Sequence, residues 1–176
     1  PQGLSIADYA GAEDRSALAV SAGTSERRAL STLEELVPLC HEAIAVLAPD
    51  FESGRIADLE GCAFAQTSEA ADDDATVREL GAPDPAGGAL RVAGVTTASP
   101  EVDAAELVLL ADENAVFTAQ NVVPLYRIGA LGEPQIKALN VVAGELTTAD
   151  LADMIGQVRG GSGSADVARV WLDAHL

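Results

Sequence analysis

The sequence predicts an α/β fold whose character changes after about the first two thirds of the chain. Up to residue 111, short apolar runs typical of strands alternate with stretches of helical spacing. From residue 128 onward, the periodic stretches all have helical spacing. Residues 114–127 join the two parts and carry one apolar run, 122–126, which Pro124 interrupts. Because proline has no N–H to give to a ladder, we expect this run to be an edge or crossing segment.

The first part contains short runs that we expect to be strands. They are apolar or interleaved with small residues, and turn-forming residues bound them. These runs are residues 4–7, 15–21, 43–47, 62–66, 90–95 and 106–111. The last of them is nearly continuous in apolar residues and should be buried.

Helix start and stop signals lie between these runs. Thr32 and Glu35 occupy capping-box positions, and Pro38 should end or bend the helix that they open. Another helix is expected over residues 72–80, where three aspartates in the first turn suit the positive end of the helix dipole. Residues 81–88 are rich in glycine and proline and should form turns.

The last third predicts three helices. Pro134 marks the start of the first, because proline is favoured in the first helical turn. Thr147 precedes Asp150 by three residues and opens the second, which Gly160 should stop. Ser164 is expected to cap the third. The apolar stripes of the second and third helices are Leu151, Met154, Ile155 and Val158, and Val167, Val170 and Trp171.

Composition limits the classes of partner. Hydrophobic residues make up 48% of the 176 residues but aromatic residues only 3%, so alanine and valine must fill much of the core. The formal net charge is −18 at pH 7. A charge of this sign repels a phosphate backbone, so we expect no nucleic-acid partner. A cationic or neutral small molecule fits better, and an acidic surface that serves only solubility is the alternative.

The residues offer no arrangement that suggests catalysis. His41 and His175 are the only histidines, and neither belongs to a credible serine–histidine or cysteine–histidine pair. No glycine-rich nucleotide loop follows a strand. The aspartates at 72–74 lack the ligand spacing of a calcium loop. We therefore expect no enzyme, no cofactor and no metal site.

Two observations bear on the compartment. Cys40 and Cys62 fit neither a redox motif nor a zinc site. They can form a disulfide in an oxidising compartment, and two reduced, buried thiols are the alternative. No apolar run approaches the roughly 18 residues of a spanning helix, and no signal segment opens the sequence.

Three patches resemble one known family. Residues 3–20, GLSIADYAGAEDRSALAV, are similar to the first inter-lobe crossing of the glycine-betaine/choline class of ABC-importer solute-binding proteins. Residues 121–127, NVVPLYR, are similar to the return crossing of that family. Its terminal signature is mirrored by Leu146-Thr147, Asp150, Gln157-Val158, residues 160–163, Val167-Ala168 and Trp171-Leu172.

The resemblance implies a periplasmic-binding-protein-like fold of type II, with one complete α/β lobe and a helical C-terminal part that belongs to the other lobe. Residues 1–14 would be the first crossing, 15–105 the complete lobe, 106–127 the return crossing and 128–176 the helical part. It also implies an extracytoplasmic location, a small cationic or zwitterionic osmolyte-like solute held between two lobes, and an ABC permease as partner.

The matching positions imply a set of ligand-binding residues. They are Asp8, Tyr9, Glu13, Asp14, Thr96, Thr97, Gln120 and Asn121. Quaternary ammonium solutes are held in aromatic cages. Here Glu13 and Asp14 replace polar amides of the family, Ser16 replaces an aromatic residue, and Gln120 stands where tyrosine is frequent, so the cage is depleted.

A further departure concerns the first lobe. Family members carry a long segment before the counterpart of Gly3, and the sequence lacks it. Leu151, Met154, Ile155, Val170 and Trp171 would then expose an apolar surface. A missing upstream piece, a swapped or symmetric homodimer, or helices repacked on the remaining lobe would each resolve this. The alternative function is accordingly a non-catalytic remnant of the fold that acts as a dimeric interaction or structural protein.

Overall fold

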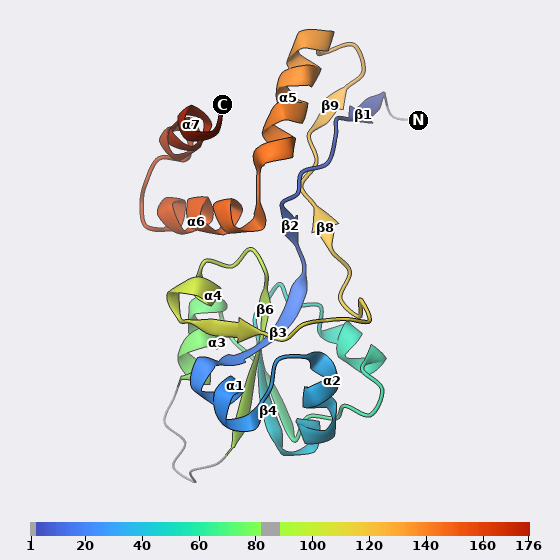
Figure 1. Ribbon diagram of the computed structural model, residues 1–176, viewed down its shortest axis with the longest axis vertical. Helices are drawn as coiled ribbons and strands as arrows, with labels where there is room; N and C mark the ends of the chain where they lie inside the picture. Colours follow the sequence, from blue (N-terminus) through green and yellow to red (C-terminus); the bar gives the residue numbers. More distant parts are fainter. Residues whose placement is uncertain (1–2, 82–88) are drawn as a thin grey trace. The chain divides into compact units, whose positions relative to one another are not determined.

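A computed structural model describes residues 3–81 and 89–176. Most of the segment predicted to form turns, 82–88, lies outside the described residues. The chain divides into two compact units, which we call unit 1, residues 1–14 and 119–176, and unit 2, residues 15–118. Figure 1 labels their helices and strands.

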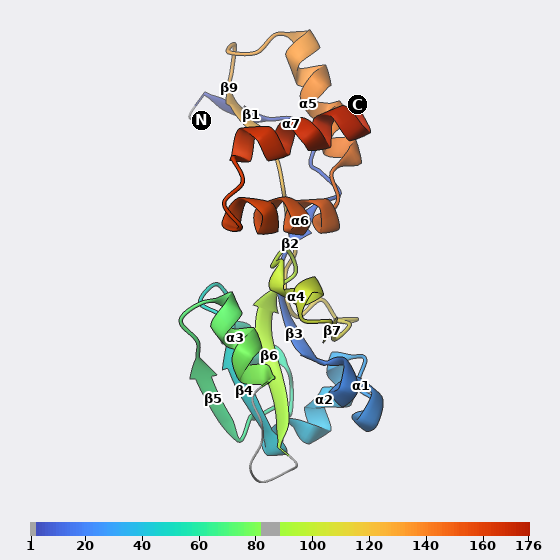
Figure 2. The same cartoon turned by 90° about the vertical axis from the view of Figure 1, so that its left-hand side faces the viewer.

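Unit 2 is built on a five-stranded sheet in the order β5-β4-β6-β3-β7. The strands are β3 (Ser16–Ser21), β4 (Ala43–Leu47), β5 (Gln66–Glu69), β6 (Leu90–Thr96) and β7 (Leu107–Leu109). β4 runs parallel to β5 and β6, whereas β3 runs antiparallel to β6 and β7. The first four of these can be followed side by side in Figure 2.

Both faces of this sheet are covered. Side chains alternate between faces along a strand, so Leu18 and Val20 join one apolar cluster, whereas Ala19 joins the other. The helical elements of unit 2 are α1 (Ala22–Arg28), α2 (Leu33–Leu36), η1 (Val37–Glu42), η2 (Ser53–Asp58), α3 (Asp73–Leu80) and α4 (Glu101–Ala104). Leucines from α2 cover the first face, and Leu80 of α3 and Val102 of α4 cover the second.

The helix signals of unit 2 are confirmed. Thr32 and Glu35 form the predicted capping box, in which the Thr32 hydroxyl accepts from Glu35 N and the Glu35 carboxylate accepts from Thr32 N. Pro38 lies where α2 gives way to the 3₁₀ helix η1. Asp72, the first of the three aspartates, is the N-cap of α3, and its carboxylate accepts from Ala75 N at 2.7 Å.

Two strand predictions in unit 2 need correction. The strand expected at 62–66 is β5, which begins only at Gln66. In the residues before it, Cys62 is bonded to Cys40, and Ala65 N–H is shared by the carbonyls of Cys40 and Ala43. The run 106–111, expected to be buried, is half-buried along β7, because β7 forms the edge of the sheet.

The described residues of unit 1 form two separate two-stranded ribbons and three helices. β1 (Leu4–Ile6) pairs with β9 (Leu125–Arg127), and β2 (Glu13–Asp14) pairs with β8 (Gln120–Asn121), both antiparallel. Pro124 lies between β8 and β9, and its carbonyl accepts from Ala7 N at 3.0 Å.

The helices of unit 1 are α5 (Glu133–Glu145), α6 (Thr148–Arg159) and α7 (Ser164–His175). Pro134 lies in the first turn of α5, and Thr147 and Asp150 form a capping box at α6. Ser164 is the first residue of α7 and Gly163 its N-cap, which corrects the expected cap. Figure 2 shows α7 stacked on α6.

The core of unit 1 consists mainly of alanines. Ala10, Ala12 and Ala143 form its buried cluster, with Leu146 and Leu151 partly buried against it. Trp171 is buried, and its ring stacks on the imidazole of His175 at a centroid distance of 4.4 Å. Along the described parts of the chain, no helix has the length and apolar character needed to cross a bilayer.

Candidate functional site

The predicted ligand-binding residues fall in both units. Thr96 and Thr97 belong to unit 2, and the other six belong to unit 1. Within unit 1, the β2–β8 ribbon places Glu13 opposite Asn121 and Asp14 opposite Gln120. Residues that lie opposite one another project on the same face of a ribbon, whereas neighbours along a strand project on opposite faces. Each face of this ribbon therefore carries one acid and one amide.

The position of β2 is fixed by the first turn of α6. Glu13 N donates to the Thr148 hydroxyl oxygen at 3.1 Å, and that hydroxyl is 3.1 Å from the Glu13 carbonyl oxygen. Both carboxylates, of Glu13 and of Asp14, are half-buried.

Asn121 has a structural role within the same ribbon. Its Nδ2 donates to the carbonyl oxygen of Ala10 at 3.1 Å, and Val122 N donates to Ala12 O at 3.0 Å. The Asn121 amide therefore ties β8 to the segment that precedes β2. Its neighbour Gln120 is exposed.

Asp8 and Tyr9 lie in the extended segment between β1 and β2. Asp8 N donates to Asn140 Oδ1 of α5 at 3.0 Å, and Ala10 N donates to Val122 O at 2.8 Å. The segment is thus held on both sides of Tyr9. The Tyr9 side chain is 71% exposed, which is unusual for an aromatic residue in a chain that has so few.

In unit 2, Thr96 and Thr97 lie where β6 ends. Thr96 is opposite Ser16 in the ladder. Thr97 is bonded to Arg15 twice: Thr97 N donates to Arg15 O at 2.9 Å, and Arg15 N donates to Thr97 Oγ1 at 3.2 Å. The Thr97 hydroxyl therefore fixes the point at which the chain enters β3.

Three residues beside this strand end were not predicted. Ser99 is 3% exposed, and its Oγ lies 2.7 Å from Glu101 Oε2 and 3.2 Å from Asp73 Oδ2. A hydroxyl has one hydrogen to donate, so it serves one of these carboxylates at a time. The available signal was the polar residues Thr96, Thr97 and Ser99 after a buried strand, because polar residues at strand ends frequently belong to sites.

The comparison with known families settles the class of the chain. A family model described as the substrate binding domain of the ABC-type glycine betaine transport system matches residues 1–174. The chain belongs to this family. A search of curated proteins finds no sequence match.

Solved structures share the fold of this glycine-betaine-type domain. A glycine betaine/carnitine/choline ABC transporter structure is 18% identical with a TM-score of 0.75; the alignment covers 98% of this chain and 64% of that one. Apo YehZ from Escherichia coli is 22% identical with a TM-score of 0.67, covering 98% and 66%. Lactococcal OpuAC complexed with glycine betaine is 16% identical with a TM-score of 0.56, covering 98% and 68%.

These findings confirm the predicted fold class. The glycine-betaine-type domain is a mixed α/β, periplasmic-binding-protein-like structure with one complete five-stranded lobe. It spans slightly less than two thirds of the first matched structure. Residues 106–118, grouped with the return crossing on sequence grounds, lie in unit 2, because β7 pairs with β3. The description of residues 1–14 and 106–127 as crossings stays a prediction.

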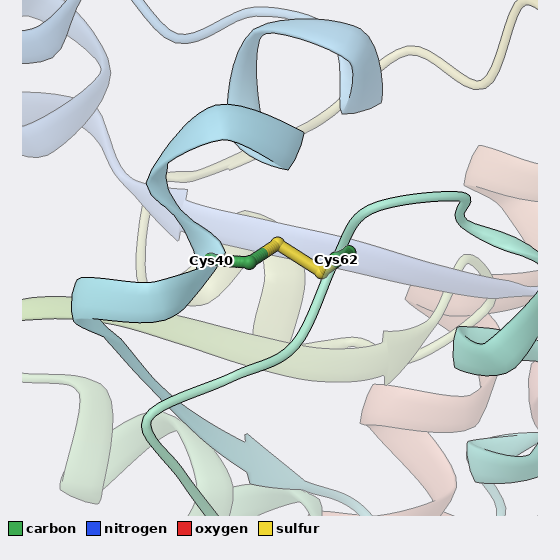
Figure 3. The surroundings of a disulfide bond; sticks show 2 residues. All are labelled: Cys40 and Cys62. Atoms are coloured by element: carbon green, nitrogen blue, oxygen red, sulfur yellow. A yellow bond between two sulfur atoms is a disulfide. The ribbon is translucent and has the colours of Figure 1, made fainter.

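The domain has one disulfide, Cys40–Cys62, with a Cα–Cα distance of 5.2 Å (Figure 3). It ties the 3₁₀ helix η1 to the loop that follows η2. Cys40 is fully buried in the core of unit 2. Of the two states that the sequence left open, the structure contains the bonded one.

Unit 2 also contains a cavity of about 430 Å³ near this disulfide. It is lined by Leu33, Glu34, Val37, Asp58, Leu59, Glu60, Asn114 and Val116. Asn114 Nδ2 donates to Glu34 Oε1 at 2.6 Å, and Asp58 forms an ion pair with Arg55 at 2.9 Å. None of the residues predicted to bind ligand lines it.

Proposed function

We propose that this domain is the solute-binding component, or part of one, of an ABC importer for a small cationic or zwitterionic compound of the glycine betaine and choline class. The observation that carries the proposal is the family match, which extends over residues 1–174. Two of the matched structures support the solute class, because one is described as a glycine betaine/carnitine/choline transporter and another as complexed with glycine betaine.

The proposed site suits a quaternary ammonium group. Such a group cannot donate hydrogen bonds, so it is recognised by aromatic faces and by nearby negative charge. Tyr9 would offer the face. Asp8, Glu13 and Asp14 would supply the charge, and the overall charge of −18 favours the approach of a cation.

The polar residues of the site would recognise the other end of a zwitterionic solute. Hydroxyl and amide hydrogens can donate to a carboxylate. Thr96 and Gln120 are the candidates for this role. Thr97 and Asn121 would act by holding backbone, because their side chains bond Arg15 N and Ala10 O.

The remaining parts of the proposal concern setting and partners. The domain would act outside the cytoplasm and deliver its solute to the membrane permease of the transporter. The Cys40–Cys62 bond agrees with this setting, because disulfides persist in oxidising compartments. We propose binding and not catalysis, with no cofactor.

A thermal-shift screen tests the proposed function. The purified domain is heated with betaine, choline, carnitine, proline betaine or ectoine. A solute at a hundred times its Kd should add about 2.7 kcal/mol to the free energy of unfolding. A raised midpoint with one of these compounds supports the proposal, and no shift with any of them contradicts it for this chain.

Two substitutions test the proposed residues. Replacing Tyr9 with alanine or Glu13 with alanine should each weaken solute binding at least about tenfold, because each removes roughly 1.4 kcal/mol of attraction for the cation. Tyr9→Phe keeps the ring and should bind normally. Glu145→Ala removes an exposed acid at the end of α5 and is the matched control for charge. Unchanged affinity in both alanine variants would refute this placement of the site.

A second candidate function, a dimeric interaction or structural protein, is favoured by one observation. Large apolar side chains of unit 1, such as Ile6 and Leu125, are exposed. A mass that rises with concentration, together with no thermal shift from any solute, would favour this candidate over the first.

A further inference from the structure

The cavity of unit 2 is separate from the proposed solute site. Its volume of about 430 Å³ lies in the range of small-molecule sites. All of the residues that line it belong to unit 2, and none is among the residues proposed to bind the solute. It therefore needs an explanation of its own, and we call it the unit 2 cavity.

Three segments of unit 2 form the walls of this cavity. The first is α2 with the start of η1, the second is the end of η2 with the turn after it, and the third is the loop 112–117. They contribute Leu33, Glu34 and Val37, then Asp58, Leu59 and Glu60, and then Asn114 and Val116.

The three walls are tied to one another in pairs. Asn114 Nδ2 of the loop donates to Glu34 Oε1 of α2 at 2.6 Å. Arg55 Nε of η2 donates to the carbonyl oxygen of Val116 in the loop at 2.9 Å. The disulfide joins η1 to the turn after η2 (Figure 3). Because each wall is held by the other two, the unit 2 cavity is preformed, and a ligand would have little to order on binding.

The loop 112–117 is also anchored from below. The Asp112 carboxylate accepts from Val116 N at 2.9 Å and from Phe117 N at 2.8 Å. Phe117 is buried, and its ring lies 5.3 Å from that of Phe51, centroid to centroid. This wall is thus fixed by the core of unit 2 as well as by its neighbours.

The lining has an apolar floor and an acidic rim. Leu33 and Leu59 are buried, and Val37 and Val116 are half-buried. The four polar residues, Glu34, Asp58, Glu60 and Asn114, are exposed. Among the described residues that line the cavity, none is aromatic. A ligand that fits this lining has an apolar chain and positive charge.

The rim carries negative charge that the protein does not balance. Arg55 pairs with Asp58 at 2.9 Å. Glu34 is bonded to the neutral amide of Asn114, and within residues 3–81 and 89–176 neither Glu34 nor Glu60 is in an ion pair. A carboxylate accepts several hydrogen bonds, so the bond from Asn114 leaves Glu34 able to accept more.

We propose that the unit 2 cavity binds a small linear diamine in its diammonium form. One ammonium group donates to Glu34 and the other to Glu60, and the methylene chain between them lies on the apolar floor. A primary ammonium group has several N–H donors for carboxylates, whereas a quaternary ammonium group has none and is held by aromatic faces. The unit 2 cavity should therefore reject the solutes of the proposed function, and the proposal does not depend on that function.

Titration calorimetry of the full chain tests the proposal, with diaminopentane as the probe. In about 0.15 M salt, where exposed charges are well screened, one molecule should bind per chain. Butylamine has an apolar chain but only one charge, and it should bind at least about tenfold more weakly. Choline in excess should not displace the diamine.

Matched variants locate the diamine. Glu34→Gln with Glu60→Gln keeps the shape of the rim and removes both charges, so diamine binding should weaken at least about tenfold. The control, Glu26→Gln with Glu79→Gln, removes the same charge from exposed acids of α1 and α3 and should bind normally. Tyr9→Ala, a variant of the proposed solute site, should also bind the diamine normally. Thermal unfolding checks that each variant is folded.

Four results would overturn the proposal. Titration of the native chain without heat of binding would show that the cavity takes no diamine. Displacement of the diamine by an equal concentration of magnesium chloride would mean that the rim attracts any cation. An equal loss in the control variant would assign binding to the overall charge, and a loss in Tyr9→Ala would place the diamine in the solute site. None of these results bears on whether betaine or choline binds, so the two proposals fail separately.

Discussion

Units 1 and 2 follow the same local rules but differ in how their apolar side chains are buried. The largest fully buried side chains, among them Phe117, Leu18 and Leu33, all lie in unit 2. The twelve large apolar side chains that are exposed in the described residues all lie in unit 1. Unit 2 has a five-stranded sheet with two covered faces, whereas unit 1 has two short ribbons.

The local structure of the two units is nevertheless alike. Thr32 and Glu35 in unit 2 form the same capping box as Thr147 and Asp150 in unit 1. Helix ends are therefore determined by neighbouring residues in both units. Closure of the core depends instead on strands that come from distant parts of the chain, and only unit 2 has enough of them. Four sets of substitutions test this contrast, from the largest expected effect to the smallest.

Removal of the disulfide should destabilise unit 2 most. The bond closes a loop between residues that are 22 positions apart, and a loop of this length restricts the unfolded chain by about 3 kcal/mol. Cys40→Ala with Cys62→Ala should lower the free energy of unfolding of unit 2 by about this amount and leave unit 1 unchanged. Urea unfolding, monitored by a probe in each unit, measures this loss in the free energy of unfolding. As a control, reductant should lower the stability of the native domain and not that of the double variant. Equal losses of stability in both units would contradict the assignment of the disulfide's effect to unit 2.

The same substitution at two glycines should have opposite effects in the two units. A Cβ on Gly94 in β6 would lie 2.6 Å from Leu47 Cδ2 and 2.9 Å from two atoms of the Phe51 ring. Gly94→Ala should therefore cost about 1–3 kcal/mol by overpacking the core of unit 2. A Cβ on Gly144 in α5 would meet nothing within 4 Å, so Gly144→Ala should stabilise unit 1 by about 0.5–1 kcal/mol. Thermal unfolding of both variants measures the two changes in stability. Two changes of the same sign would contradict the contrast between the units.

The elements predicted from sequence are those with a strong local signal. β3, β4 and β6 are apolar runs bounded by turn residues, and the capping boxes at α2 and α6 can be read directly from threonine–acid spacing. β5 was displaced by four residues because Gln66–Glu69 contains no apolar residue. It is a strand only because β4 lies beside it in parallel register, and no local pattern encodes that pairing.

The candidate site was harder to predict for the same physical reason. Glu13 and Asn121 are opposite one another in β2 and β8, yet the two strands have only two residues each and lie far apart in the sequence. The prediction that these two residues belong to one site rested on the family resemblance, and their local sequence did not indicate it. The carboxylates of Asp73 and Glu101 beside Ser99 come from two helices, and a single sequence does not show that these helices meet.

Loss of a single cap should have a smaller effect than removal of the disulfide or overpacking at Gly94. The Thr147 hydroxyl accepts from Asp150 N at 3.2 Å and lies 2.6 Å from Asp150 Oδ2. Thr147→Ala should destabilise unit 1 by about 1 kcal/mol, because a backbone N–H at the start of α6 loses its partner. Thr32→Ala should do the same to unit 2. Thr147→Ser keeps the hydroxyl and is the control; a serine variant as unstable as the alanine variant would mean that the methyl group, and not the cap, matters.

The smallest effect should be a dependence on pH that both units share. A hydrogen bond from the side chain of Thr147, with one from its backbone, lowers the pKa of Asp150 from 3.8, and hydrogen bonds from Ser31 and Thr32 lower the pKa of Glu35 from 4.5. A carboxylate whose pKa is lower in the folded state adds stability above its unfolded pKa and loses it as the pH falls through the folded value. Below pH 4.5 in unit 2 and below pH 3.8 in unit 1, each cap should therefore weaken as its acid is protonated.

Glu35→Gln and Asp150→Asn isolate these two contributions. Each amide cannot ionise, so each variant should be less stable than the native domain above pH 4.5 and should lose less stability on acidification. Thermal midpoints measured from above pH 4.5 to below pH 3.8 give the difference, with Glu145→Ala as a control for loss of an exposed acid. Glu35 is exposed and Asp150 is only half-buried, so the effects should be small and should shrink in high salt. A variant that loses as much stability on acidification as the native domain would show that other carboxylates cause the loss. The shared capping box would then not be what gives the two units their common dependence on pH.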